Sequence, residues 1–124
     1  MNGAKKILVA DDEPNILLSL EFLMRKSGYE VFIARNGSEA MEIVKKHNPA
    51  LAVLDIMMPD IDGYQICSFI KNSVEHKACK VIFLSAKSKD ADIQKGMEFG
   101  ADYYMTKPYS TRALMQKVND MLQA

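Results

Sequence analysis

Leu51-Ala52-Val53-Leu54-Asp55-Ile56-Met57-Met58-Pro59-Asp60-Ile61-Asp62-Gly63 is an apolar run that ends in one carboxylate and then breaks at a proline. The run 51–54 lies between Asn48-Pro49 and Pro59, which is typical of a strand buried on both faces, as in parallel sheets. A carboxylate at the carboxyl end of such a strand faces the crevice where open α/β sheets bind ligands. Asp55 is therefore the first candidate for a reactive group.

The rest of the chain repeats this pattern. Four further apolar runs predict strands, at residues 6–10, 30–34, 81–84 and 102–105. Segments with apolar residues at three- and four-residue spacing alternate with them and predict helices, at 14–28, 36–47, 63–72, 88–99 and after residue 110. Strands that alternate with helices through short loops predict an α/β fold, with a five-stranded parallel sheet covered on both faces by right-handed crossovers.

Helix boundary signals support these assignments. Pro14 suits a first helical turn, because its missing N–H has no partner there in any case. Asn36 and Glu39 form an N-x-x-E start signal, and Ser110 is placed to cap the last helix. The helix 88–99 is expected to be the weakest. It has Ile93 and Met97 to bury, and Gly96 in its interior lowers helix propensity by about 1 kcal/mol.

Composition limits the function classes. The 124 residues are expected to form one domain, 1–124, without a separate output domain, and 16 basic residues balance 16 acidic ones. This balance does not favour nucleic acid or a membrane surface as a partner. Cys67 and Cys79 are too few for a disulfide framework and are expected to be reduced. With no membrane span and no signal peptide, we expect a cytoplasmic protein.

Polar side chains follow four of the expected strands, and these residues are Asp11 with Asp12, Asp55, Ser85 and Lys107. Parallel strands end at one edge of a sheet, so these side chains are expected to form one site. Three carboxylates gathered there repel one another by several kcal/mol at an effective dielectric of about 20, so a cation must lie among them. An oxygen-only donor set suits a hard cation, Mg²⁺ in particular, with Mn²⁺ as a second candidate.

A carboxylate beside Mg²⁺, a lysine and a hydroxyl is a set of groups suited to phosphoryl transfer. Aspartate can serve as the nucleophile and form an acyl phosphate. We therefore expect Asp55 to attack a phosphoryl group whose remaining oxygens contact Lys107 and Ser85. The pair Asp11-Asp12 taken alone fits a helix cap before Pro14 equally well.

Other polar residues are given structural roles. The segment 60–63 resembles a fragment of a calcium loop, but no complete ligand pattern follows it, so it is expected to form a turn and cap a helix. His47 and His76 lie near predicted element ends and are interpreted as surface residues rather than phosphoryl carriers.

Five motifs in order resemble a receiver domain of a two-component response regulator, of the chemotaxis-protein type. They are Ile7-Leu8-Val9-Ala10-Asp11-Asp12-Glu13, the stretch from Asp55 to Gly63, Leu84-Ser85-Ala86-Lys87, Gly100-Ala101-Asp102-Tyr103-Tyr104 and Met105-Thr106-Lys107-Pro108. The resemblance covers essentially the whole chain. It implies a flavodoxin-like (βα)5 fold with strand order 2-1-3-4-5.

The resemblance also implies a function. Asp55 would take a phosphoryl group from a phosphohistidine on a sensor histidine kinase or a histidine phosphotransfer protein. Asp12, Asp55 and the backbone carbonyl of Met57 would ligate Mg²⁺, with Asp11 acting largely through water. The chain would be a signalling phosphoacceptor that promotes its own phosphorylation and dephosphorylation, rather than an enzyme with a small-molecule substrate.

The same resemblance implies a switch and its tuning. Ser85 would move toward the phosphate, Tyr104 would change rotamer with it, and Lys107 would precede a cis proline. Met57 and Lys87 occupy the two positions that tune how fast the acyl phosphate is lost. Since Met57 offers no strong polar group to an attacking water, slow autodephosphorylation is expected.

The expected output surface is formed by the fourth helix, fifth strand and fifth helix, which would control an output domain or a downstream protein. The transcription-factor subfamily dimerises through this surface. This chain departs from the usual interfacial charges at Tyr103, Ile93 and Ala113, while Glu98, Asp102, Arg112 and Lys117 remain. A homodimer is therefore expected to have an incomplete set of ion pairs.

Two alternatives use the same residues differently. A phosphohydrolase of the haloacid-dehalogenase kind also uses Asp, Ser or Thr, Lys and acidic metal ligands. That family places its nucleophile in an Asp-x-Asp pair after the first strand, whereas here adjacent Asp11-Asp12 follow it. A binding module that has lost phosphorylation is disfavoured, because every required site residue is present. No P-loop or Gly-rich dinucleotide fingerprint indicates nucleotide binding.

Overall fold

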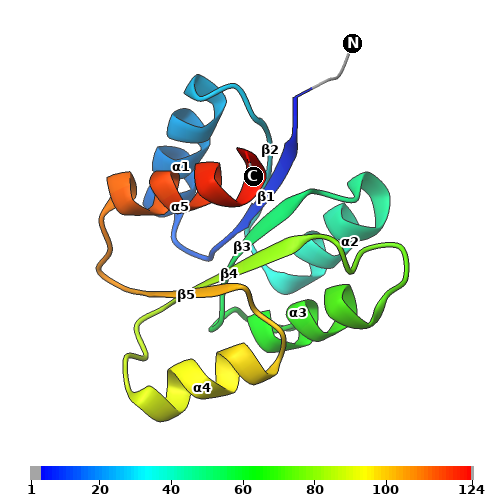
Figure 1. Ribbon diagram of the computed structural model, residues 1–124, viewed down its shortest axis with the longest axis vertical. Helices are drawn as coiled ribbons and strands as arrows, with labels where there is room; N and C mark the ends of the chain where they lie inside the picture. Colours follow the sequence, from blue (N-terminus) through cyan, green and yellow to red (C-terminus); the bar gives the residue numbers. More distant parts are fainter. Residues whose placement is uncertain (1–3, 124) are drawn as a thin grey trace.

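The computed structural model describes residues 4–123 and contains one five-stranded sheet. All strand pairs are parallel, and the strand order is β2-β1-β3-β4-β5 (Figure 1). The predicted flavodoxin-like topology is therefore confirmed. The strands are β1 (Lys6–Ala10), β2 (Glu30–Ala34), β3 (Leu51–Asp55), β4 (Lys80–Ser85) and β5 (Tyr103–Thr106).

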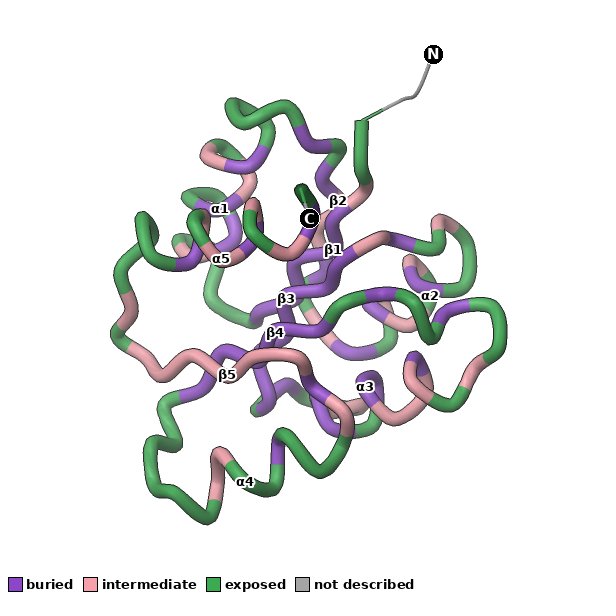
Figure 2. The backbone as a smooth tube through the Cα atoms, in the orientation of Figure 1, coloured by how far each residue is buried: buried purple, intermediate pink, exposed green. Residues whose placement is uncertain are grey.

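Helices cover both faces of this sheet, as Figure 1 shows. They are α1 (Pro14–Lys26), α2 (Gly37–His47), α3 (Gly63–Asn72), α4 (Asp90–Glu98) and α5 (Thr111–Gln123). Alternate side chains of each strand enter two separate cores. Leu8 and Leu54 pack with residues of α2 and α3, whereas Ile7 and Val53 pack with residues of α1 and α5. The central strands are buried along their length (Figure 2), which explains why they read as continuous apolar runs.

The helix-start signals at Pro14, Asn36 and Ser110 are confirmed. Pro14 is the first residue of α1. The Asn36 side chain accepts a hydrogen bond from the Glu39 N–H over 2.8 Å, and Ser110 Oγ accepts one from the Ala113 N–H over 3.1 Å. Each bond satisfies an N–H that a helix leaves without an internal partner.

The turn after β3 caps two helices, one more than the sequence predicted. Asp62 forms a capping box with Gln65 at the start of α3, as expected for the segment 60–63. The Asp60 carboxylate accepts hydrogen bonds from the N–H of Gly37 (3.0 Å) and of Ser38 (3.2 Å), so it caps α2 as well. A Cβ at Gly37 would lie 1.9 Å from the Ile61 carbonyl oxygen, and glycine is needed for this close approach.

Some predicted boundaries and one predicted burial are wrong: α1 ends at Lys26 rather than residue 28, and β4 spans Lys80–Ser85 rather than 81–84. Strand β5 begins at Tyr103, one residue late. Asp102 still contacts β4, because its N–H donates to the Val81 carbonyl over 2.8 Å and its carboxylate accepts from the Val81 N–H over 2.8 Å. Helix α4 runs over Asp90–Glu98 rather than 88–99. Its buried residue is Gly96, while Met97 is 43% exposed. Met97 faces solvent because the backbone of α4 itself approaches the sheet at Gly96.

The interpretation of His76 as a surface residue is also wrong. Its ring is buried, with Nδ1 2.9 Å from Asn48 Oδ1 and the Phe69 ring beside it. A hydrogen-bonded histidine in this setting links the α3–β4 loop to the end of α2. Cys67 and Cys79 are free, as predicted, and both are buried. Among residues 4–123, the helices are too short or too polar to cross a lipid bilayer.

Candidate functional site

The polar residues that follow the strands meet at the carboxyl edge of the sheet, as predicted. Asp55 and Ser85 are the last residues of β3 and β4, and Asp11 and Lys107 lie directly beyond β1 and β5. Because the four strands are adjacent and parallel, their ends deliver these side chains to one place. Asp11, Asp55 and Ser85 are buried there, although all three are polar.

Lys107 holds the site together. Its Nζ lies 3.0 Å from Asp11 Oδ2, 3.4 Å from Asp55 Oδ2 and 3.0 Å from Glu13 Oε1. The side chains of Asp11 and Asp55 are 0% and 7% exposed, so these ion pairs are little screened by solvent. Removing the ammonium would leave two buried carboxylates without their counter-charge.

The carboxylates are crowded despite that lysine. Burial and, next, the Asp11 charge raise the pKa of Asp55 to about 6, against the opposing effect of the Lys107 charge. Burial likewise raises the pKa of Asp11. Burial would lower the pKa of Lys107, but hydrogen bonds to Asp11 and Glu13 outweigh this effect and raise it. The site therefore holds more negative charge than one lysine neutralises, which favours a second cation.

The donor set fits such a cation. Carboxylate oxygens of Asp11, Asp12 and Asp55 all lie within 4.8 Å of one another, with Asp12 exposed at the mouth. Oxygen donors without a neighbouring thiolate or imidazole in this cluster suit hard divalent ions such as Mg²⁺ or Mn²⁺. Asp12, Asp55 and Asp11 are thus the side chains that could hold the metal.

Ser85, the last residue of β4, is held by a hydrogen bond from the loop that follows it. Its Oγ accepts a hydrogen bond from the Lys87 N–H over 3.0 Å, and the Lys87 carbonyl accepts one from the Tyr104 hydroxyl over 2.8 Å. Tyr104 therefore connects β5 to the β4–α4 loop, which follows Ser85. The Lys107–Pro108 peptide is cis, as the sequence resemblance implied.

A family model for the response regulator receiver domain matches residues 7–119. This chain belongs to the response regulator receiver family. Similar solved structures include the receiver domain of Francisella response regulator 1452, at 30% identity and a TM-score of 0.89, with 96% of this chain and 97% of that one covered. The BeF3-activated DrrB receiver domain shares 33% identity over 98% of this chain and 99% of that chain, with a TM-score of 0.89.

A third similar structure is the signal receiver domain of a signal transduction histidine kinase from Syntrophus aciditrophicus. The two chains are 32% identical, the alignment covers 97% of this chain and 91% of that one, and the TM-score is 0.88. Receiver domains thus occur both in regulators and in kinases among the relatives of this one. The family match does not support the haloacid-dehalogenase alternative.

Met57 stands at the mouth of the receiver site. Its N–H donates to Asp55 Oδ1 over 3.1 Å, which orients the carboxylate, and the residue is 59% exposed. The side chain is therefore open to solvent beside the candidate acceptor. That the Met57 carbonyl ligates a metal stays a prediction.

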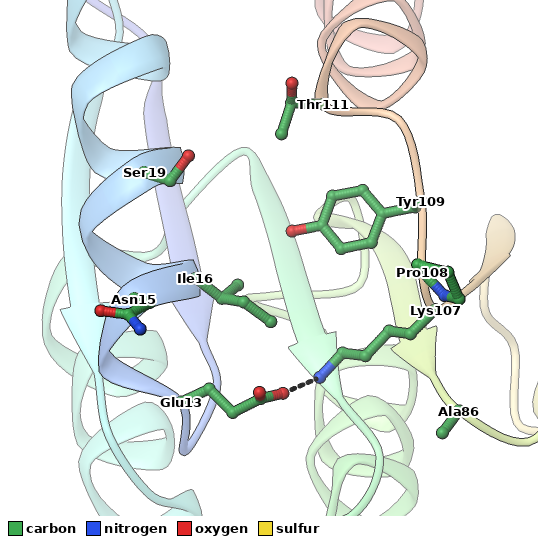
Figure 3. Close-up of a pocket in the computed structure, with 9 residues that line it drawn as sticks. All are labelled: Glu13, Asn15, Ile16, Ser19, Ala86, Lys107, Pro108, Tyr109 and Thr111. Atoms are coloured by element: carbon green, nitrogen blue, oxygen red, sulfur yellow. Dashed lines mark hydrogen bonds and ion pairs between the residues drawn. The ribbon is translucent and has the colours of Figure 1, made fainter.

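Sequence reasoning missed Glu13 as a site residue. Its carboxylate pairs with Lys107, and its N–H donates to Asp11 Oδ1 over 2.9 Å. Glu13 and Lys107 border a groove of about 570 Å³ between α1 and the β5–α5 loop. The Tyr109 ring points into this groove (Figure 3). Pro14 was a signal, because it places Glu13 at the N-cap position of α1. Glutamate is not a favoured N-cap residue, and the Glu13 side chain makes no cap bond.

Proposed function

We propose that this receiver domain accepts a phosphoryl group on Asp55 from a phosphohistidine of a sensor histidine kinase or a histidine phosphotransfer protein. The observation that carries the proposal is the buried Asp55 carboxylate at the sheet edge, paired with Lys107 and crowded by two further acids. Such a carboxylate is activated by its position and is poised beside the charges that a phosphoryl group requires.

In the proposed transfer, an Asp55 carboxylate oxygen forms the new bond to phosphorus. The phosphorus–nitrogen bond of the phosphohistidine breaks, and its electron pair stays on the imidazole nitrogen. Lys107 and Ser85 bind the phosphoryl oxygens, and Met57 orients the carboxylate through its N–H. Bound Mg²⁺, held by Asp11, Asp12 and Asp55, would supply neutralisation of the phosphoryl charge.

Phosphorylation would then act as a switch. It adds negative charge and strong acceptor oxygens at Asp55, where Ser85 and Lys107 can bind them. The loop after Ser85 leads into α4, which has a single buried residue and so belongs to the less stable part of the fold. A change there would alter the surface of α4, β5 and α5 that meets an output domain or downstream protein.

We infer that residues 1–124 act as one receiver unit, without direct nucleic acid binding. Of the four charges that remain for a homodimer through α4, β5 and α5, two already have partners within the chain. Asp102 already pairs with Lys71 over 2.9 Å, and Lys117 Nζ lies 4.4 Å from the centre of the Tyr103 ring.

The test is phosphorylation by a small phosphodonor. Wild type incubated with acetyl phosphate and Mg²⁺ is expected to gain one phosphoryl group by intact-protein mass, and Asp55→Asn is expected to gain none. Chelation of Mg²⁺ should reduce the wild-type adduct. An adduct of equal yield in Asp55→Asn would overturn the proposal. The control variant is Asp62→Asn, which alters a nearby helix cap and should gain the phosphoryl group as wild type does.

Met57→Asn is expected to shorten the lifetime of the acyl phosphate. An amide at this exposed position can hydrogen-bond an attacking water, which the thioether does little to assist. One such hydrogen bond in the transition state corresponds to a rate increase of about fivefold. Phosphate release from purified phosphoprotein measures it, and an unchanged rate would count against a braking role for Met57.

A further inference from the structure

Gly96 of α4 is packed against the ring of Tyr104, the residue for which the family resemblance implies a change of rotamer. A Cβ built at residue 96 would lie 2.8 Å from Tyr104 Cδ2 and 3.1 Å from Tyr104 Cε2. It would also lie 3.1 Å from Phe83 Cδ2. The Tyr104 and Phe83 rings meet edge to face, with centroids 6.3 Å apart. The backbone of α4 thus leaves space for the Tyr104 ring because residue 96 has no side chain.

The position of that ring fixes a chain of hydrogen bonds. With the ring against Gly96, the Tyr104 hydroxyl donates to the Lys87 carbonyl over 2.8 Å. The N–H of the same residue, Lys87, donates to Ser85 Oγ over 3.0 Å. The Ser85 oxygen therefore uses a lone pair within its loop, and its own hydroxyl proton stays free to donate elsewhere.

We propose that Gly96 is a positioning residue for Ser85: the space it leaves seats Tyr104, whose hydroxyl holds the Lys87 turn and so fixes the position of the Ser85 hydroxyl at the carboxyl edge of the sheet. This inference rests on the proposed transfer to Asp55 and assigns it a residue that contacts none of the reacting atoms. A hydroxyl held in one orientation binds the phosphoryl oxygens without first having to be ordered.

Any side chain at residue 96 should move Tyr104 and leave Phe83 in place. Phe83 is fully buried and has no room to yield, whereas Tyr104 is half-buried at the surface and can swing outward. Alanine is also a better helix former than glycine, so Gly96→Ala should keep α4 helical. The expected result is an outward Tyr104 ring that no longer reaches the Lys87 carbonyl.

The first experiment observes the ring directly. Protein labelled with 3-fluorotyrosine carries five tyrosines, and the ¹⁹F signal that disappears in Tyr104→Phe is that of Tyr104. Gly96→Ala should shift this signal and leave that of Tyr29, in the opposite core, unchanged. Gln94→Ala, on the exposed side of α4, should leave both unchanged. A Tyr104 signal that stays in place in Gly96→Ala would overturn the proposal.

The second experiment measures phosphorylation by acetyl phosphate. Gly96→Ala and Tyr104→Phe should each slow it about fivefold, the loss expected for one hydrogen bond, and the double variant should be no slower than either single variant. A rate equal to wild type in Tyr104→Phe, or single effects that multiply in the double variant, would overturn the link to Ser85. Tyr104→Phe keeps this test decisive even where Gly96→Ala fails to fold. If wild type itself is not phosphorylated, the proposed function fails, and the fluorine signals still decide whether Gly96 seats the ring.

Discussion

In metal-free buffer at about pH 8, the Asp55→Asn variant is expected to unfold at a higher temperature than wild type. Burial and Asp11 raise the pKa of Asp55 from 3.8 to about 6 in the folded protein, so its charge destabilises that state. The shift, which already includes the opposing Lys107 charge, sets an upper bound of about 3 kcal/mol, and we expect a gain of about 1–2 kcal/mol. For a chain of this size the melting temperature should rise by roughly 3–8 °C.

The pH dependence has a definite sign. The folded state holds the Asp55 proton more tightly than the unfolded state, so this contribution to stability is fully present below about pH 4 and is lost as the pH rises through about 6. The advantage of Asp55→Asn should therefore vanish at low pH. Thermal melts in chelator at several pH values measure it. A variant that melts below wild type at about pH 8 would contradict the electrostatic account.

Lys107→Met is expected to have the opposite effect. The substitution keeps an unbranched side chain but leaves the buried carboxylates of Asp11 and Asp55 without their ammonium partner. Breaking a buried pair from one side lowers the free energy of unfolding by about 2–4 kcal/mol, after allowance for the 15% exposure of Lys107. Urea unfolding in metal-free buffer measures this loss.

The control for Lys107→Met is Lys46→Met, which removes a lysine from the exposed side of α2. It should change the free energy of unfolding by less than about 0.5 kcal/mol. The loss in Lys107→Met should shrink at low pH, because protonated carboxyl groups need no counter-charge, and it should shrink in the double variant with Asp55→Asn. Equal losses at low and high pH would point to lost packing instead.

The sheet and most of the site were predictable because both follow from short-range pattern. A strand buried on two faces must be a continuous apolar run, and Asp55 and Lys107 stand where two such runs end. Once the alternation of strands and helices indicated a parallel sheet, the geometry of that sheet brought the ends together. The contact between Lys107 and Asp55 needed no further information from the sequence.

Pairs between distant segments were not predictable in this way. Glu13 and Lys107 are 94 residues apart, and Asp60 and Gly37 are 23 apart. His76 finds its partner Asn48 at a separation of 28 residues. Each of these polar residues also suits a solvated loop, and local pattern does not distinguish a polar residue with a distant partner from one without.

Helix α4 shows a different limit. Its apolar residues predicted that Ile93 and Met97 face inward and that Gly96 only weakens the helix. In the structure Gly96 is the residue that packs, because two aromatic rings from β4 and β5 fill the space where a side chain would be. Hydrophobic periodicity counts side chains, so it cannot register a contact made by the absence of one.

The measurement that tests the central claim most directly locates the phosphoryl group. After incubation with acetyl phosphate and Mg²⁺, borohydride reduces an aspartyl phosphate to homoserine, and peptide mass spectrometry reads the position. We expect homoserine at position 55 in wild type, with much less when Mg²⁺ is chelated. Homoserine at positions 11 or 12 instead, or phosphorylated protein in which residue 55 remains aspartate, would contradict the assignment of Asp55 as the acceptor.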